Sequence, residues 1–233
     1  MNLLVCEDDA IRFYTTIIKP QEHTSSLIGL KLLARRKWMP TLVKESLVVN
    51  SCVVNATSPE RFLDAIRNMT LNVRSEGINT SIGLIPQSAL ALYCNFVARD
   101  AKKTCVNLTT HIIDQLSDGK SLASILTGGI HKTVSIKPRV CMIDVDSKDV
   151  FHDEIKHFLW DNNIPVTAIT ETTGGFHVFV DKERLSKSQN KKLWTTWGEV
   201  KRDGKELTRI HRDAITPIPG TLHAGFQTKY TVF

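Results

Sequence analysis

The sequence predicts a mixed α/β (α+β) protein whose centre is a β-α-β-β-α-β unit over about residues 138–225. Three observations predict this class: strand-like apolar runs alternate with segments of helical spacing, serines at N-cap positions begin two helices, and a Gly-Gly pair joins two strand-like runs. With 233 residues the chain can form one large domain or two lobes sharing a cleft. We expect residues 1–85 to form a smaller N-terminal α/β lobe and residues 86–233 to form the core.

The first 85 residues carry the weakest signals. The basic segment Leu27–Lys37 is compatible with a helix or with the end of a strand, and both alternatives stay open. Ser46–Asn55 is rich in β-branched residues and predicts a strand. A helix is predicted from the N-cap residue Ser58 to about Asn72, because a proline and an acid follow the serine.

The rest of the chain supplies one further strand and helix and then the central unit. Ser88–Val97 predicts a strand, and Arg99–Leu116 predicts a helix that Asp-Gly ends. The central unit then consists of a strand at Arg139–Asp146, a helix at Lys148–Trp160, strands at Pro165–Thr170 and Phe176–Val180, a helix from the cap Ser186 to about Trp197–Val200, and final strands over Leu207–Phe233. In this pattern, which RNA-recognition domains also have (RRM-like), the first and third strands are adjacent and central.

Two aspartates, Asp144 and Asp146, occupy alternate positions on the first of these strands. Alternate side chains share a face, so the carboxylates point the same way, about 7 Å apart along the strand. Like charges raise each other's pKa unless a cation lies between them. The usual cation is a hard divalent ion bound through oxygen, Mg²⁺ or Mn²⁺, which also holds a phosphate. The pair therefore predicts a metal site that handles nucleotides.

The third strand of the central unit and the turn before it contain the next candidate site residues. Gly174 and Gly175 predict a tight hairpin turn with positive φ. His177 shares a strand face with Phe179, so we expect it to lie opposite the aspartates and to donate to a phosphate. Further along the chain, Asp213 precedes a Pro-Gly-Thr turn whose amides and hydroxyl are suited to binding an anion.

Composition limits the partners and the compartment. A net charge of +6 suits a polyanion, although a mildly basic solvated surface explains it equally well. The five cysteines are scattered without C-x-x-C spacing, which argues against a zinc site or a disulfide framework and for a reducing compartment. We find no signal peptide and no apolar run of about 18 residues, so we expect a cytoplasmic protein, or one in a host's cytoplasm or nucleus, without membrane contact.

Together, the D-x-D strand, the T-G-G-x-H hairpin and the later acid resemble the motifs of the archaeo-eukaryotic primase (AEP) superfamily, which includes primases, primase-polymerases and bacterial end-joining polymerases. Asp144 and Asp146 match its first motif, and Gly175–His177 matches its small-residue-x-His motif. Asp213 matches the third, acidic motif, with Glu206 as a rival. The resemblance covers about residues 138–225, with a weaker match at Leu92–Lys103 and none over residues 1–85. The zinc module of some members is missing.

The resemblance implies a primase-type catalytic core that transfers nucleotides from NTPs or dNTPs to a 3′-hydroxyl on a single-stranded DNA template. It implies Mg²⁺ or Mn²⁺ held by Asp144, Asp146 and Asp213. The implied nucleotide contacts are His177, Thr172, Thr173, Gly174, Gly175, Arg212, Thr221, His223 and Lys229, and the weaker DNA contacts are Asn95, Arg99, Lys102 and Lys103. Because the chain has no P-loop motif, a separate replicative helicase is the expected partner.

Two other functions stay open on the sequence. A catalytically degenerate primase-like domain could bind DNA or start replication through partners. A D-x-D glycosyltransferase would use the acids for Mn²⁺ and a nucleotide-sugar, but it usually needs a longer chain and gives the T-G-G-x-H hairpin no role. The basic residues of these segments are interpreted as solvated helix faces rather than template contacts: Lys31, Arg35, Arg36 and Lys37, and Lys187, Lys191 and Lys192. Trp194 and Trp197 are expected in the core.

Overall fold

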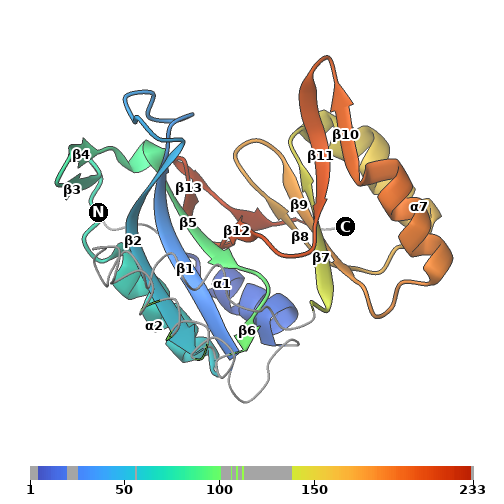
Figure 1. Ribbon diagram of the computed structural model, residues 1–233, viewed down its shortest axis with the longest axis horizontal. Helices are drawn as coiled ribbons and strands as arrows, with labels where there is room; N and C mark the ends of the chain where they lie inside the picture. The colour runs from blue at the N-terminus through green and yellow to red at the C-terminus, as the bar shows by residue number, and fades with distance from the viewer. Residues whose placement is uncertain are drawn as a thin grey trace.

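The computed structural model describes residues 5–19, 26–55, 57–100 and 138–231, together with the single positions 106, 109 and 112. Two β-sheets, one of seven strands and one of six, dominate it, and helices pack against each of them (Figure 1). The mixed α+β class predicted from the sequence is confirmed. No helix within these described ranges is long and apolar enough to cross a membrane.

The seven-stranded sheet is built around β1 (Ser26–Arg35), which pairs antiparallel with both β2 and β5. Leu27–Lys37 is thus a strand and a turn rather than a helix, and Ser46–Asn55 is the predicted strand. The other members are β2 (Ser46–Asn55), β5 (Leu90–Asn95), β6 (Arg99–Asp100), β12 (Ile215–Pro217), β13 (Leu222–His223) and β14 (Phe226–Gln227). Strands from both ends of the chain therefore share this sheet.

Helices α1 (Glu7–Phe13), continued by the π-helix η1 (Tyr14–Ile18), and α2 (Pro59–Thr70) pack against this sheet (Figure 1). The cap predicted for α2 is confirmed, since the Ser58 hydroxyl accepts a hydrogen bond from the backbone N–H of Arg61 at 3.3 Å. The short hairpin β3 (Ile78–Thr80) and β4 (Gly83–Ile85) and the 3₁₀ turn η3 (Gln87–Ala89) lead into β5.

The helix predicted from Arg99 does not begin there, because Arg99 and Asp100 are extended and pair with Ser26 and Leu27. The pairing with β1 overrides the local helical pattern at this point. Most of the remaining predicted helix lies outside the described residues, although Val106, Thr109 and Ile112 are helical.

The six-stranded sheet has the order β10-β11-β7-β9-β8-β15. Its members are β7 (Val140–Val145), β8 (Val166–Glu171), β9 (Phe176–Asp181), β10 (Glu199–Arg202), β11 (Lys205–His211) and β15 (Lys229–Tyr230). β7 and β9, the first and third strands of the predicted unit, are adjacent and central, as expected. The predicted β-α-β-β-α-β order is therefore present in the sheet.

One face of this sheet is covered by the helical segment α5 (Lys148–Val150), η5 (Phe151–Ile155) and α6 (Lys156–Asp161), and by α7 (Lys187–Trp197). The predicted cap of α7 is a full capping box between Ser186 and Gln189. On α7, Trp197 is buried in the core of this sheet and Trp194 packs against that core partly buried, so both tryptophans contribute to the core as predicted.

Alternation along β7 decides what each residue of the strand contacts. Ile143 and Val145 pack into the helical core on one face. Met142 faces the other way and joins the core of the seven-stranded sheet, as does Phe179 on β9. Asp144 lies on this second face, one step further along the strand, where the two sheets separate. On this face of β7, Met142 is therefore packed between the sheets, whereas Asp144 lines the cleft where they separate.

Candidate active site

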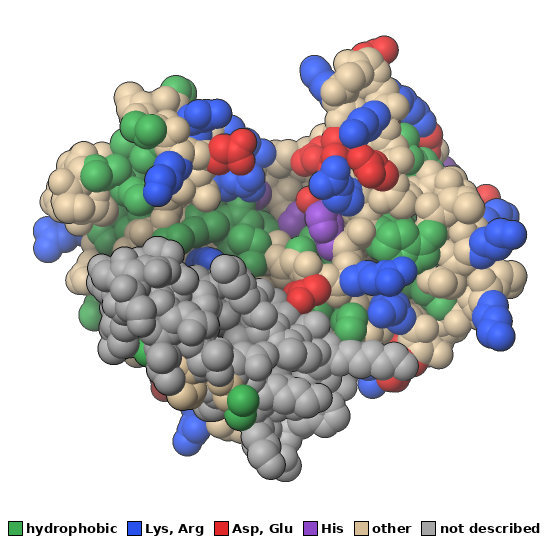
Figure 2. Space-filling view, viewed as in Figure 1, with side chains coloured by type: hydrophobic (Ala, Val, Ile, Leu, Met, Phe, Trp, Pro, Cys, Tyr) green, Lys and Arg blue, Asp and Glu red, His purple; other side chains and the backbone are tan. Residues whose placement is uncertain are grey.

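A cleft of about 240 Å³ lies where the two sheets separate. Figure 2 shows histidine side chains at the base of a hollow between the two halves, with acidic and basic side chains on its walls. The residues that line this central cleft are Leu33, Arg35, Lys37, Ser46, Tyr93, Asp144, Asp146, Thr172, Gly174, His177, Ile215, Pro217 and His223. Six residues predicted from the sequence to handle metal or nucleotide therefore line one cavity: Asp144, Asp146, Thr172, Gly174, His177 and His223.

Asp144 and His177 are direct partners across β7 and β9. The His177 Nε2 atom lies 3.2 Å from Asp144 Oδ1, so the histidine does face the first aspartate. Its Nδ1 atom lies 2.8 Å from the Thr216 hydroxyl. Because an ionised carboxylate can only accept, the His177 Nε2–H donates to Asp144, and Nδ1 shares a hydrogen bond with the Thr216 hydroxyl. Thr216 therefore fixes the histidine from the neighbouring sheet.

The two aspartates have pKa values on opposite sides of the ordinary value. Burial alone would raise the pKa of Asp144, but the hydrogen bond from His177, with His211 and Lys37 nearby, brings it below the usual range. Partial removal from water and the charge of Asp144 raise the pKa of Asp146. The mutual repulsion expected from the sequence is therefore visible at Asp146, while Asp144 is held ionised at neutral pH.

The turn at Thr172–Gly175 is held against the end of β7. Neither glycine has positive φ, so the predicted conformational reason for the pair is wrong. Gly175 is needed for space instead: a Cβ there would lie 1.8 Å from the backbone oxygen of Val145, whereas a Cβ at Gly174 would meet nothing within 4 Å. The Gly175 N–H donates to the Thr172 hydroxyl at 3.3 Å. This close approach places the turn beside the aspartates.

His223, predicted as a nucleotide contact, is a buried residue that orients its neighbours. Its Nδ1 accepts from the Thr173 N–H at 3.4 Å, and its Nε2 lies 3.0 Å from the Tyr93 hydroxyl. Arg35 donates to the same hydroxyl at 3.3 Å. His223 thereby links the turn that contains Thr173 to β5 and β1. Burial, reinforced by nearby His177, Lys37 and Arg35, lowers the pKa of His223 to about 3.

Replacing His223 with glutamine should make the free energy of unfolding depend less on pH below neutrality. Between about pH 6.5 and about pH 3 the unfolded chain binds a proton that the folded protein excludes, so the free energy of unfolding falls as pH falls. From pH 7 to pH 5 the wild type should lose about 2 kcal/mol through this group, and H223Q should not. Denaturant unfolding of both proteins at the two pH values measures the difference, and equal losses would contradict the prediction.

The structure does not bring the predicted third acid into the central cleft. Asp213 is exposed on the loop between β11 and β12 and does not line the cleft. Its rival Glu206 forms an ion pair with Arg209 at 2.5 Å. His211, which was not among the predicted site residues, places its Nε2 atom 4.0 Å from Asp144 Oδ2. We did not predict His211, because its position depends on how β11 pairs with β7.

Other predicted contacts lie away from the central cleft. The Arg212 guanidinium stacks on Trp194 at 4.8 Å, on the side of α7. Thr221 is buried and donates to the Ile218 carbonyl at 2.6 Å. Lys229 pairs with Glu171 at 3.4 Å. Asn95 is buried on β5, and its side-chain oxygen has no hydrogen-bond partner among the residues described.

Two further DNA contacts predicted from the sequence, Lys102 and Lys103, lie outside the described residues. The same holds for the side chain of Arg99.

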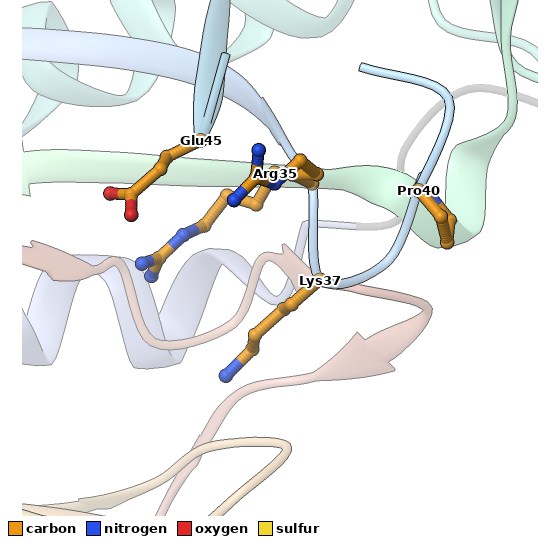
Figure 3. A pocket seen from close by; sticks show the side chains of 5 residues that line it. Arg35, Lys37, Pro40 and Glu45 are labelled. Atoms are coloured by element: carbon orange, nitrogen blue, oxygen red, sulfur yellow. The ribbon is translucent and has the colours of Figure 1, made fainter. Parts of the chain in front are cut away.

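The basic residues Lys31, Arg35, Arg36 and Lys37 were predicted to form a solvated helix face, but they lie on β1 and in the turn that follows it. Arg35 and Lys37 line the central cleft. They also line a wider hollow of about 620 Å³ beside it, together with Arg36, Pro40 and Glu45. Figure 3 shows Lys37 and Glu45 extending to the same side of this hairpin. We call this second cavity the basic hollow. Had Leu32–Arg35 been treated as a strand, the alternation of its side chains would have placed Leu33 and Arg35 on one face.

The aspartate pair has the chemistry of a divalent-cation site. Two carboxylates at alternate strand positions on the wall of an open cleft offer oxygen ligands of the kind that Mg²⁺ and Mn²⁺ bind. Within the described part of the chain, no three side chains of His, Cys, Asp or Glu are gathered so as to hold a metal ion as they stand. Asp144 is engaged by His177, so its oxygens would have to turn from that partner to a cation.

Comparison with protein-family models, with curated proteins and with solved structures finds no match to this chain. The assignment of a function therefore depends on the chemistry of the central cleft.

Proposed function

We propose that this protein is a primase-type nucleotidyltransferase, which adds nucleotides from NTPs or dNTPs to a 3′-hydroxyl on a single-stranded DNA template. The observation that carries the proposal is the in-register pair of Asp144 and His177, 3.2 Å apart on adjacent central strands. Around this pair the central cleft gathers Asp146, a glycine turn and two cationic side chains. Acids, phosphate donors and cations in one cavity are what transfer of a charged nucleotide requires.

Asp144 and Asp146 are the residues that would hold Mg²⁺ or Mn²⁺. When bound, a divalent ion at this position lowers the pKa of the attacking hydroxyl and neutralises charge on the leaving phosphate. His177 would then release Asp144, and its Nε2–H would become a donor for a phosphate oxygen. Thr216 keeps the ring in place during this exchange because it holds the other ring nitrogen.

The turn and the opposite wall would bind the triphosphate and the template. Thr172 and Gly174 line the central cleft next to the aspartates, and the exposed Gly174 would offer a backbone amide. Arg35 and Lys37 face them from β1 and its turn, and the basic hollow continues from these two side chains towards the solvent. Such a cationic path is suited to a single-stranded backbone that a separate helicase would expose.

The double variant R35A/K37A should bind single-stranded DNA at least about tenfold more weakly at low salt. Each lost phosphate contact removes about 0.7 from the slope of log affinity against log salt concentration. Fluorescence anisotropy with a labelled oligonucleotide over a salt series measures both quantities. The matched control is K187A/K191A on the exposed face of α7, which removes the same formal charge and should leave the slope unchanged. Equal effects of the two pairs would show that net charge alone is responsible.

Extension of a labelled primer on a single-stranded template tests the proposal directly. The reaction should require Mg²⁺ or Mn²⁺ and should stop when a chelator is added. Supplying NTPs and dNTPs separately identifies the preferred sugar, and omitting the primer tests for priming. Absence of product with either metal and either nucleotide set would overturn the proposal.

A second candidate function is a catalytically degenerate primase-like domain that binds DNA. It is favoured by one observation: Asp213 lies outside the central cleft, and Glu206 is paired with Arg209. Such a domain would bind single-stranded DNA through Arg35 and Lys37 but would give no extension product with either metal. The two assays together separate the candidates.

A further inference from the structure

The outermost strand of the seven-stranded sheet, β2, has a long backbone edge. It is ten residues long and lies at one end of the strand order, where it pairs with β1 along one edge. Figure 1 shows it on the side of this sheet that is turned away from the six-stranded sheet. Among the described residues, no strand pairs with its other edge. Such an edge is a template for pairing with another chain, because its N–H and C=O groups can extend the sheet.

The composition of β2 does not block this edge. Its sequence, SLVVNSCVVN, contains no charged residue and no proline, the two kinds of residue that commonly prevent pairing of an edge strand. Val48 and Val53 are 45% and 38% exposed. The backbone N–H of Ser51 donates to the side-chain oxygen of Asn50 at 2.9 Å, so a partner strand would have to replace only a local acceptor there.

The side chains of β2 are arranged symmetrically about Ser51. β1 pairs with nine residues of β2, and Ser51 is the fifth of them, because Val49 is the extra residue of a bulge and has no partner on β1. Val48 and Val53 pair with β1 residues that are four positions apart, so both valines lie on the same face. A two-fold axis at Ser51 therefore places Val48 of one copy opposite Val53 of another.

The other positions of β2 match in the same way. Under this symmetry Leu47 lies opposite Val54, and Ser46 lies opposite Asn55. Leu47 and Val54 both face the core between the sheet and α2. A hollow of about 520 Å³ lies between β2 and α2, with Val54 and Ala65 in its wall. Leu47 of a second copy, next to Val54, would lie over this hollow and fill part of it.

We propose that this protein forms a two-fold symmetric dimer in which the β2 strands of two copies pair antiparallel about Ser51. The pairing joins the two seven-stranded sheets into one continuous sheet and covers the exposed valines. Each copy uses its β2 edge once, so the assembly closes at two copies. Of the ten residues of β2, Ser46 alone lines the central cleft, so the interface is separate from the aspartates and their neighbours.

Charge substitutions test both the pairing and its register. In V48K/V53K each new lysine would face a lysine of the other copy, so the Kd of the dimer should rise at least about tenfold. In V48E/V53K each glutamate would face a lysine, and the dimer should be retained. The two variants change the same two exposed positions, so each is the control of the other. Sedimentation equilibrium over a concentration series measures the Kd, and thermal melting confirms that each variant is folded.

Three outcomes of this experiment would overturn the proposal. The first is a wild type that stays monomeric at about 100 μM. The second is a V48K/V53K variant that dimerises with the wild-type Kd. The third is equal weakening in both variants, because the register about Ser51 would then be wrong.

Cysteine crosslinking locates the two-fold axis directly. In S51C the two new cysteines would be directly opposite, with Cα atoms about 5 Å apart, which a disulfide can span. In S46C they would lie at opposite ends of the paired strands, about 27 Å apart. Mild oxidation should therefore give a disulfide-linked dimer with S51C and none with S46C, and the wild type, which contains Cys52, gives the baseline. Crosslinking of S46C without S51C would overturn the proposal.

The dimer and the proposed function can fail separately. Primer extension by a protein that stays monomeric at all concentrations would keep the activity and remove the interface. A charge-sensitive dimer that never extends a primer would keep the interface and remove the polymerase activity.

Discussion

The variant D144N should lose nucleotidyl transfer by at least about a hundredfold while keeping its fold. Asp144 is the carboxylate whose pKa is held low at the base of the central cleft, so it supplies the permanent negative charge of the site. Asparagine has the same shape and can still accept the hydrogen bond from His177, but it cannot supply that charge. Single-turnover primer extension measures the loss, and the melting temperature should change little.

The control for this variant is D161N, which removes an exposed carboxylate at the end of α6. It changes the net charge equally and should extend primers at the wild-type rate. D146N should also be impaired, because Asp146 lines the same cleft. If D144N extended primers as fast as D161N does, the reaction would have to occur elsewhere on the molecule.

The central sheet could be predicted because its signals are local. Apolar runs, capping serines and the hairpin established the order of strands and helices, and the general rule for this order placed the first and third strands side by side. Alternation then placed Asp144 and His177 on one face, and the structure pairs them directly. Residues close together along the chain therefore carried most of the predictable part of the site.

The opposite wall of the central cleft and the position of His211 beside Asp144 could not be predicted, because both depend on contacts between distant segments. Leu27–Lys37 has a pattern compatible with helix or strand, and only its pairing with β2 and β5 fixes it as β1. The position of His211 depends on the register of β11 against β7, and the β10–β11 hairpin that feeds this register contains an irregularity at Val200 and Lys201. A one-residue slip would move His211 to the other face.

The variant G175A should destabilise the protein more than any other single change considered for the site. The new methyl group would lie 1.8 Å from the backbone oxygen of Val145 and within 3.1 Å of the backbone N–H of Ser147. Neither atom can move as a side chain can, so the turn must separate from the end of β7. We expect a loss of roughly 2–4 kcal/mol, which corresponds to a drop of about 5–15 °C in melting temperature.

The neighbouring variant G174A is the matched control for this effect. It adds the same methyl group one residue earlier, where nothing lies within 4 Å, and neither glycine has positive φ. Its melting temperature should stay within about 2 °C of the wild type, since alanine also restricts the unfolded chain. If the two variants melted together, the close approach of Gly175 to β7 would not hold the turn in place. If the melting temperature falls in G175A alone, the activity that this variant retains should show a raised KM for the nucleotide. The reason is that Thr172 and Gly174 would have left the wall of the central cleft.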